Sequence, residues 1–503
     1  MNLVEMLNIN AGKYADRECI RYEGAGLTFA GLKVAADKAA GLLQSWGVSK
    51  GDKVAVMSYN TTAFVISFFG ALEAGAAVVP INHKLAAPEV DYILEHSGAK
   101  VFLFDAALDQ IARKVTAKAR MAALDSDTEG FDRFESAMEN APAFTPVEIA
   151  ENDLAEILYT SGTTGKPKGC LHTHGNVIFA GISGAMCMKI DDHDRLLMAM
   201  PIWHSSPLNN WFIGSQYMGA ATVLIREYHP LKFLQAVQDE RCTLYFGAPI
   251  SYIMPAQMIP NFSDYDLSSM RCWIYGGGPI SGDVAIMLME KYRSKNFYQV
   301  YGMTEAGPSG TVLYPQDQVS KAGSIGRVAI PGADVIVMKN ENEKATPGEV
   351  GEIWIKSPCM MKGYYNNPGG TAEAFAGGWY KTGDVARLDE DGYLYIVDRT
   401  KDMIVTGGEN VYSKEVEDAI AGYPGVVEVA VIGKPHPEWG ETVTALIVTK
   451  PDTTINEEEL KFYLTEKLAK YKIPRAFSFV GELPHTPTGK VKKYELRRQL
   501  SQV

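Results

Sequence analysis

Apolar residues follow two alternating patterns over the first two thirds of the chain. Residues 28–47 show a helical pattern, with Thr28 as a candidate N-cap, Gly47 after the end, and one apolar face formed by Phe29, Leu32, Ala36, Ala39, Leu43 and Trp46. Short apolar runs, typical of buried strands, stand at 54–57, 100–104, 155–160, 221–225 and 271–275. Helices that alternate with such strands predict parallel sheets covered by helices.

The most apolar stretch, residues 63–81, contains Glu73 and Pro80. We therefore expect a buried helix that leads into a strand, and no membrane-spanning segment.

The pattern changes after residue 330. Residues 331–400 hold short alternating segments separated by turns, which predict an antiparallel β-subdomain, and an α/β pattern returns after Arg399. There, Asn456 is the expected N-cap of a helix whose apolar face is formed by Leu460, Leu464, Leu468 and Tyr471. The predicted fold is α/β: a large N-terminal domain (1–400) of parallel sheets plus the β-subdomain, followed by a small mobile α/β domain (401–503).

Composition narrows the class of protein. The 503 residues include 48 Lys+Arg and 60 Asp+Glu, a net charge of −12, which argues against a dedicated nucleic-acid binder. The six cysteines lie far apart without a CxxC pair, as is typical of free thiols in a reducing compartment. The first residues lack a signal-peptide pattern, so we expect a cytoplasmic protein.

The strongest chemical signal is the segment YTSGTTGKPKG at 159–169. Its glycines allow backbone N–H groups to approach phosphate oxygens, and its hydroxyl groups and lysines add donors and positive charge. It is not a Walker loop, because only two residues separate Gly162 from Gly165 and Pro167 stands where that motif needs Ser or Thr.

This segment resembles the phosphate-binding loop of the adenylate-forming superfamily, which includes acyl-CoA synthetases, firefly luciferase and peptide-synthetase adenylation domains. Further segments resemble the family's motifs in the family's order, at 201–204 (PIWH), 275–279 (YGGGP), 299–305 (QVYGMTE), 380–384 (YKTGD), 398–402 (DRTKD), 407–412 (GGENVY) and 487–490 (PTGK). Local similarity is greatest to bacterial fatty acyl-CoA ligases of about this length.

The resemblance implies a site that activates a carboxylic acid with ATP and Mg²⁺. The residues that it places on the nucleotide are Thr160, Ser161, Gly162, Thr163, Thr164, Gly165, Lys168, Gly276, Gly277, Gly278, Pro279, Gln299, Tyr301, Gly302, Met303, Asp384 and Arg399. Among them, Tyr301 lies on the adenine, and Asp384 and Arg399 bind the ribose. Thr304 contacts the α-phosphate, and Glu305 and Thr160 bind Mg²⁺, a hard cation that counters phosphate charge.

The resemblance also implies a second half-reaction with coenzyme A. Lys490 contacts the carboxylate and the α-phosphate during adenylation, and the small domain then swings about Lys401. That motion removes Lys490 and brings in the coenzyme A loop with Gly407, Gly408 and Glu409.

The acid pocket is expected to be lined by segments 203–217, 245–252 and 275–280. Their aromatic residues are Trp203, Trp211, Phe212, Tyr217, Tyr245, Phe246, Tyr252 and Tyr275, which favours a hydrophobic acid. Val300 stands where similar malonyl-CoA synthetases place Arg, which argues against a dicarboxylate. The resemblance places His204 at the pocket mouth, and His172 and His174 are expected to have local structural roles.

Three readings follow. The leading one is an AMP-forming acyl-CoA ligase for a medium- to long-chain fatty acid, with an aryl or alicyclic acid as the alternative. The second is an acyl-AMP ligase that loads a carrier protein, which CoA-dependent AMP release would separate from the first. The third is an oxygenase or a nucleotide-binding protein. No nucleic-acid partner is expected; peripheral membrane contact and a monomeric or homodimeric state are left open.

The distribution of charge fits this picture. Residues 401–503 hold 14 Lys+Arg and 15 Asp+Glu, but from Lys467 onward nine basic residues face only two acidic ones. This basic stretch includes Lys490 and is expected to approach the phosphates.

Overall fold

The computed structural model describes residues 1–160, 167–278, 280–399, 402–406, 409–436, 440–451, 453–485 and 491–500. Contacts divide the chain into two compact units. The first comprises Met1–Val335 and Ile355–Tyr380, and the second comprises Ile336–Trp354 and Lys381–Val503.

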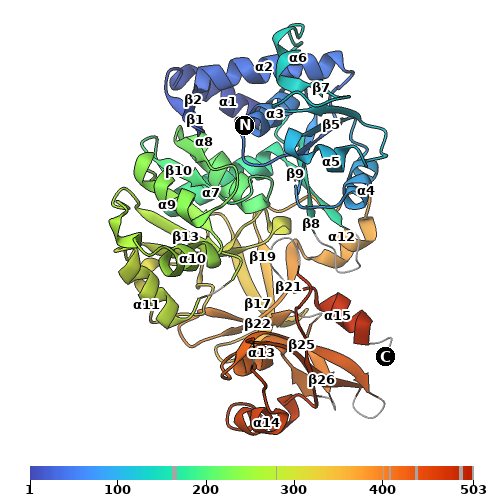
Figure 1. The fold of residues 1–503 in the computed structure, drawn as a ribbon. Coiled ribbons are helices and arrows are strands. Elements are labelled where there is room, and N and C mark those ends of the chain that lie inside the picture. Colours follow the sequence, from blue (N-terminus) through green and yellow to red (C-terminus); the bar gives the residue numbers. More distant parts are fainter. Residues whose placement is uncertain are drawn as a thin grey trace. The chain divides into compact units, whose positions relative to one another are not determined.

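The first unit contains two large sheets whose inner strands run parallel (Figure 1). The nine-stranded sheet has the order β16 (Val328–Ala329), β15 (Gly310–Leu313), β14 (Phe297–Gly302), β13 (Cys272–Gly276), β12 (Leu244–Gly247), β10 (Arg195–Met198), β11 (Ala221–Leu224), β1 (Glu18–Tyr22) and β2 (Ala25–Thr28). The seven-stranded sheet has the order β7 (Asp132–Arg133), β6 (Arg120–Ala123), β5 (Val101–Phe104), β3 (Lys53–Met57), β4 (Ala77–Ile81), β8 (Leu154–Thr160) and β9 (Lys168–Thr173).

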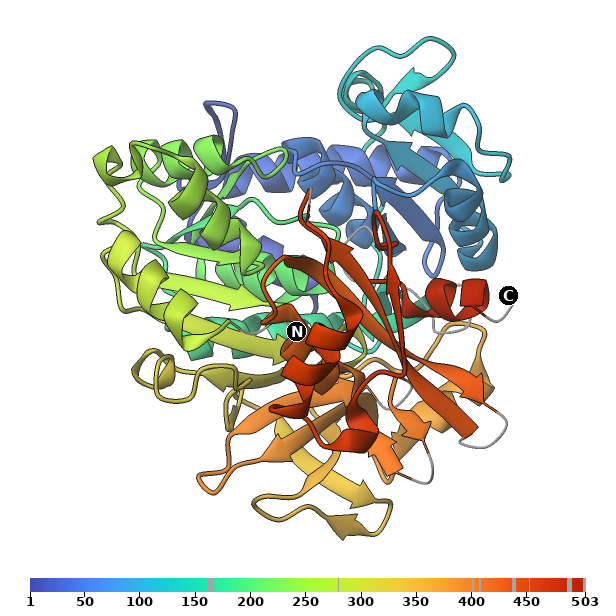
Figure 2. The same ribbon diagram turned by 60° about the horizontal axis from the view of Figure 1, so that its bottom comes forward.

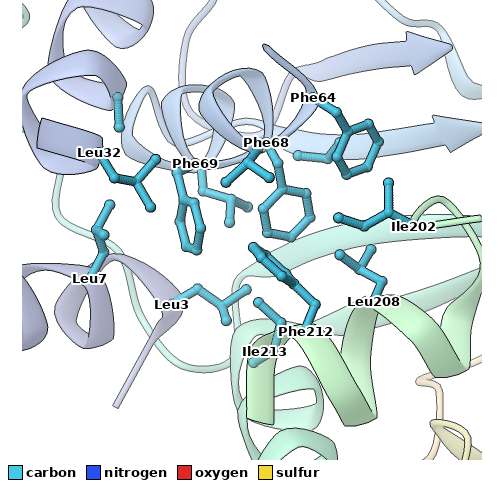
Figure 3. Packing of buried hydrophobic residues seen from close by; sticks show 14 of the residues in the cluster. Leu3, Leu7, Leu32, Phe64, Phe68, Phe69, Ile202, Leu208, Phe212 and Ile213 are labelled. Atoms are coloured by element: carbon cyan, nitrogen blue, oxygen red, sulfur yellow. The ribbon is translucent and has the colours of Figure 1, made fainter. Parts of the chain in front are cut away.

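The largest hydrophobic cluster contains residues of both sheets and of the helices packed with them. These helices are α1 (Leu3–Lys13), α2 (Phe29–Ser45), α3 (Thr62–Glu73), α6 (Phe134–Glu139), α7 (His174–Met188), the π-helix η2 (Ser206–Phe212) and α8 (Ile213–Met218). Figure 3 shows Phe68 and Phe69 of α3 against Phe212 of η2. Burial of these rings fixes η2, which carries part of the candidate site.

Separate hydrophobic clusters lie on the other face of each sheet. The nine-stranded sheet packs there against α9 (Pro230–Asp239), α10 (Ile250–Met258) and α11 (Gly282–Lys291). The seven-stranded sheet packs against α4 (Ala87–Ser97) and α5 (Asp109–Ala112). The short helix α12 (Pro368–Ala374) also belongs to this unit.

A third sheet of six strands is antiparallel in each of its described pairings. Its order is β18 (Glu343–Lys344), β17 (Asp334–Asn340), β19 (Val350–Lys356), β21 (Trp379–Leu388) and β20 (Phe375–Ala376), and β22 (Leu394–Arg399) also pairs with β21. Strands thus form where the alternating pattern of 331–400 predicts them.

The second unit also contains a five-stranded sheet, with the order β24 (Glu409–Val411), β23 (Ile404–Thr406), β26 (Gly440–Thr449) and β25 (Val426–His436), and with β27 (Ala476–Phe479) beside β26. Alternate residues of β25 and β26 face two clusters. Helices α13 (Ser413–Ala421) and α14 (Glu457–Thr465) join one cluster, and α15 (Lys493–Leu500) joins the other (Figure 2).

The model confirms the predicted fold class and several local details. The Thr28 hydroxyl caps α2 by accepting a hydrogen bond from the Gly31 N–H at 3.1 Å. Residues 63–81 form the buried α3 and the strand β4, as expected. Within the described residues, no helix combines the length and apolarity that a membrane span requires.

One helix prediction is partly wrong. Asn456 caps α14 and Leu460 and Leu464 are buried, but the helix ends at Thr465, before Leu468 and Tyr471. Beyond that point the N–H groups of Lys467 and Leu468 both donate to the Leu464 carbonyl in a turn, and Leu468 still packs against the cluster that contains Leu460 and Leu464. Tyr471 is 39% exposed and belongs to a short 3₁₀ turn.

Candidate active site

The predicted phosphate loop joins two paired strands. Strands β8 and β9 are antiparallel, and Thr160 stands opposite Lys168 at the end of the hairpin next to the connecting loop. Lys168 lies with its Nζ 4.9 Å from the centre of the Tyr364 ring. The predicted phosphate-binding residues Ser161, Gly162, Thr163, Thr164 and Gly165 fall outside the described residues.

The structure brings the two predicted metal ligands together. Glu305 belongs to a short turn, Thr304–Ala306, that follows β14. Its Oε1 accepts hydrogen bonds from the Thr160 hydroxyl at 3.4 Å and from the Tyr364 hydroxyl at 3.1 Å. Nothing in the sequence pattern points to Tyr364, which comes from a segment 59 positions further along the chain.

The turn that carries Glu305 is fixed by close backbone packing. Gly307 ends it with a φ of +74°, and a Cβ at this position would stand 1.9 Å from the Cys359 carbonyl oxygen. The Met361 N–H donates to the Glu305 carbonyl at 3.0 Å. Only glycine fits this combination of backbone angle and space, so the sequence itself determines where Glu305 stands.

The donor atoms fit a hard divalent cation. A carboxylate and a hydroxyl are oxygen ligands, and Mg²⁺ in nucleotide sites is held by one or two carboxylates together with substrate phosphates. Burial raises the pKa of Tyr364, so its hydroxyl stays protonated and donates to Glu305. Glu305 and Thr160 are therefore the residues that would hold the ion.

Thr304 has a partner that the sequence analysis did not identify. Its hydroxyl lies 2.9 Å from the hydroxyl of Ser205, which is buried. Ser205 directly follows His204 in the predicted PIWH segment, and this adjacency is the only signal that could have indicated it. The contact joins the segment that precedes η2 to the Thr304–Ala306 turn.

The PIWH segment is anchored by two side chains from elsewhere in the unit. Asn60 accepts from the Ile202 N–H at 2.8 Å and donates to the Met200 carbonyl at 3.0 Å. The Trp203 indole N–H donates to His83 Nδ1 at 3.0 Å. His204 stays half-buried, with its ring 5.7 Å from that of Trp203.

The predicted adenine strip lies at neighbouring strand ends. Gly276, at the end of β13, stands opposite Val300 of β14, and Gly277 has a φ of +85°. Ligands of open parallel sheets bind at these carboxyl ends. The strip continues through Gly278, while Pro279 lies outside the described residues. The predicted nucleotide-binding residues of the next segment lie on β14 (Gln299, Tyr301 and Gly302) or directly after it (Met303).

An apolar wall stands on one face of the same strands. A Cβ on Gly276 would lie 3.1 Å from the Phe246 ring and 3.2 Å from a Val300 methyl group, so these two side chains flank the glycine. Trp211 stacks on Phe246 with ring centres 5.5 Å apart. Its indole N–H donates to the Ser206 hydroxyl at 3.1 Å.

Part of the expected acid pocket is wrong. Tyr245, Tyr252 and Tyr275 belong to the cluster on the opposite face of the sheet. The Tyr252 hydroxyl donates to the Ile274 carbonyl at 2.5 Å, as is typical of a core tyrosine. Phe212 is also core, because it is 0% exposed and its ring lies 6.3 Å from that of Phe69 on α3. The period of two along β12 and β13 sends alternate side chains to opposite faces, and the aromatic count ignored this alternation.

In the second unit, the predicted ribose ligands are neighbours. Asp384 of β21 stands opposite Arg399 of β22, and Arg399 Nε lies 2.9 Å from Asp384 Oδ1. Asp384 is buried and Arg399 is half-buried. A carboxylate oxygen accepts hydrogen bonds, which is what the two hydroxyls of a ribose diol would need.

The residues around the predicted hinge are anchored within the second unit. Asp398 is buried and accepts from the Ser413 hydroxyl at 3.1 Å at the start of α13. Asp402 pairs with Arg497 of α15 at 2.9 Å. Lys401 itself lies outside the described residues, as do Gly407, Gly408 and Lys490, and for Glu409 only the backbone strand β24 is described.

His172 and His174, which are separated by one residue in the sequence, are buried in the first unit. The His174 ring accepts from the Leu3 N–H at 3.3 Å, and burial lowers the pKa of both imidazoles to about 4. Among the described residues, no group of three or more His, Cys, Asp or Glu side chains is placed to hold a metal ion.

Comparison with known proteins adds independent information. Residues 7–365 match the model of the AMP-binding enzyme family, and residues 415–490 match that of the AMP-binding enzyme C-terminal domain. The long-chain-fatty-acid–CoA ligase FadD13 of Mycobacterium tuberculosis is 38% identical over 478 residues, 94% of this chain and 93% of the relative. A feruloyl-CoA synthase of Amycolatopsis sp is 38% identical over 482 residues, 95% of each chain.

Solved structures agree with this similarity. The o-succinylbenzoate coenzyme A synthetase MenE of Bacillus subtilis, in complex with ATP and magnesium, superposes with a TM-score of 0.86 at 30% identity. The superposition covers 99% of both chains.

Proposed function

Because this chain belongs to the AMP-binding enzyme family and is an AMP-forming acyl-CoA ligase, we propose that its site joins a hydrophobic carboxylic acid to AMP and then to coenzyme A. The observation that carries the proposal is the convergence of Thr160, Tyr364 and Glu305 beside Thr304, all in the first unit.

In the first half-reaction, the acid's carboxylate attacks the α-phosphorus of ATP and pyrophosphate leaves. Two anions must approach, so the site has to neutralise charge as it develops. Bound Mg²⁺ supplies that positive charge next to the phosphates. In this proposal the Thr304 hydroxyl, which contacts Ser205, would donate to the α-phosphate, and Lys490 would add a cation that counters the charge of the two reacting groups.

In the second half-reaction, the thiol of coenzyme A attacks the acyl carbonyl and AMP leaves. We place the adenylation domain at 1–400 and the mobile domain at 401–503, with Lys401 as the hinge. Asp398 and Asp402, each anchored to α13 or α15, would confine the change of backbone angles to the residues between them. Lys401→Pro should therefore slow thioester formation more than adenylation, and equal effects on both steps would contradict the hinge.

The acid is proposed to be a medium- to long-chain fatty acid, in line with the FadD13 relative. The wall of Trp211, Phe246 and Val300 is apolar and offers no charged group for a second carboxylate. The stacked pair Trp211–Phe246 favours a second candidate, an aryl acid, because flat rings pack well on such a wall. The feruloyl-CoA synthase relative agrees with that alternative.

A panel of acids separates the two candidates. Pyrophosphate release should be measured for acids from acetate to palmitate, with benzoate, ferulate and cyclohexanecarboxylate included. The proposal expects the highest kcat/KM among C8–C16 acids, and a preference for ferulate or benzoate would establish the aryl alternative. Trp211→Ala should change the order of preference, whereas Trp46→Ala, which removes a tryptophan packed on Phe134, should leave it unchanged.

The free thiols support a cytoplasmic location, which we propose for this enzyme.

A further inference from the structure

Three polar side chains are buried directly behind the candidate site. Glu156, His172 and Asn209 are 0%, 1% and 1% exposed. Glu156 and His172 stand opposite each other on β8 and β9, so their side chains leave the sheet on the same face. Asn209 of η2 donates from its Nδ2 to Oε1 of Glu156 at 2.5 Å.

This cluster is only partly satisfied by hydrogen bonds. Within the described part of the chain, Glu156 Oε2 and Asn209 Oδ1 have no hydrogen-bond partner. Buried polar atoms without partners are rare in proteins and cost stability. Apolar side chains of similar size would avoid that cost, so the cluster is poorly explained as a source of stability.

The three residues belong to segments that also contain, or contact, residues of the candidate active site. Glu156 stands four positions before Thr160 on the same strand. Asn209 belongs to the helix that follows Ser205, and Ser205 contacts Thr304. The backbone of Thr304 and that of Cys359 lie close enough to the His172 imidazole to influence its pKa.

Burial shifts the pKa of both titratable members of the cluster toward the uncharged form. Burial raises the pKa of Glu156 to about 7, and burial lowers the pKa of His172 to about 4. The other titratable group facing Glu156 is Cys170 of β9, whose pKa burial raises. Below about pH 7 Glu156 is mainly protonated while His172 is still neutral, so the cluster then places no charge in the core.

We propose that Glu156, Asn209 and His172 form a positioning cluster that holds η2, and hence the bound acid, in register with the Thr304 turn that binds the α-phosphate. The inference rests on the proposed function. None of the three touches a substrate. Their effect is to align the carboxylate with the phosphorus, and misplacement by about 1 Å can cost roughly 100-fold in rate.

The test compares the two half-reactions in purified full-length variants. Glu156→Leu should slow acyl-adenylate formation by roughly 10- to 100-fold. Thioester formation from supplied acyl-adenylate should stay within about threefold, because the acid and AMP are already joined and need no alignment. Glu156→Gln should restore adenylation to within about threefold of the parent, since its amide is neutral and still accepts from Asn209.

A matched pair of controls uses the other fully buried glutamate of this unit. Glu73 of α3 is 1% exposed, and its charged neighbours are Lys33, at 3.4 Å, and Asp37. Glu73→Leu and Glu73→Gln should therefore leave the ratio of the two half-reaction rates unchanged. Any loss of folded enzyme lowers both rates equally and does not move the ratio.

Asn209→Leu removes the same Glu156–Asn209 hydrogen bond by changing the residue on η2. It replaces Glu156→Leu in the experiment if that variant does not fold. The double variant should be no slower in adenylation than the slower single variant, because both substitutions break one contact. Equal loss in both half-reactions, or adenylation at the parent rate in Glu156→Leu or Asn209→Leu, would overturn the proposal. Failure of the parent enzyme to release pyrophosphate with any acid would instead refute the proposed function.

Discussion

The Thr160 hydroxyl lies 3.4 Å from Glu305 Oε1, although the two residues stand 145 positions apart in the chain. One residue ends a strand of the seven-stranded sheet, and the other follows a strand of the nine-stranded sheet. The phosphate-binding hairpin and the proposed metal-binding turn therefore meet at this pair. The Tyr364 hydroxyl reaches the same carboxylate oxygen and completes the arrangement.

Tyr364→Phe tests the support of Glu305. The variant loses one donor to the carboxylate, so the free Mg²⁺ concentration at half-maximal velocity should rise by about 10-fold, the usual effect of removing a partner of a metal ligand. Pyrophosphate release across a Mg²⁺ titration measures this, and Mn²⁺ binding by electron paramagnetic resonance gives a readout independent of activity. Tyr365→Phe, at the neighbouring position, should change neither; an unaltered Mg²⁺ requirement in Tyr364→Phe would show that its hydroxyl is dispensable.

Asp384→Asn tests ribose binding. Replacing the carboxylate removes a charged acceptor, and hydrogen bonds to charged groups contribute about 1.5–3 kcal/mol. The KM for ATP should therefore rise by roughly 10-fold or more, with little change in the KM for the acid. Initial-rate kinetics with each substrate varied provide the measurement. Glu390→Gln, an exposed carboxylate on the turn after β21, is the control; a KM for ATP that stays at the parent value would remove Asp384 from the nucleotide site.

Lys490→Ala tests the residue that the family resemblance makes catalytic. Loss of its cation should slow acyl-adenylate formation by about 100-fold or more, because charge stabilisation in the transition state is lost. Thioester formation from supplied acyl-adenylate should be largely spared. Rapid-quench assays of each half-reaction measure both rates, with the exposed Lys470→Ala as the control. Equal slowing of the two steps would argue against this role.

Glu73 gives a prediction about stability and pH. Burial, and then the neighbouring Asp37, raise the pKa of this carboxyl to about 8, whereas an unfolded glutamate titrates near 4.5. Between these values the folded chain binds more protons than the unfolded chain, so the glutamate's contribution to stability falls as pH rises. Glu73→Gln does not titrate, and its free energy of unfolding relative to the parent should increase from pH 5 to pH 8.

From pH 5 to pH 8, the free energy of unfolding of Glu73→Gln relative to the parent should increase by about 4 kcal/mol, because one pKa unit corresponds to about 1.4 kcal/mol. Urea unfolding at pH 5, 6, 7 and 8 measures it. The exposed Glu290→Gln should show a difference that does not vary with pH. A pH-independent difference for Glu73→Gln would mean that the buried carboxyl stays ionised.

Sequence patterns predicted the fold class because helix and strand periodicities are local. Thr28, Asn456 and the 63–81 segment form caps and elements where the pattern places them. The predicted end of α14 was wrong, because the backbone turns where the N–H groups of Lys467 and Leu468 share the Leu464 carbonyl, while the apolar pattern continues to Tyr471. The apolar pattern does not contain the backbone geometry that ends the helix.

For a similar reason, the sequence predicted some residues of the candidate site and missed others. Thr160 and Glu305 could be predicted because they belong to short sequence motifs that resemble those of the family. Tyr364, Ser205 and Asn209 act through partners far away in the chain, so only the fold reveals them. The aromatic pocket was overestimated because alternate residues of a strand face opposite sides, which leaves Tyr245 in the core and Phe246 at the wall.

The most direct test of the account measures the products of the full reaction. Purified enzyme with ATP, Mg²⁺ and a hydrophobic acid should release pyrophosphate in an acid-dependent manner, and addition of coenzyme A should then release AMP and the acyl thioester in equal amounts. Release of ADP and phosphate, or no pyrophosphate with any acid, would contradict the account.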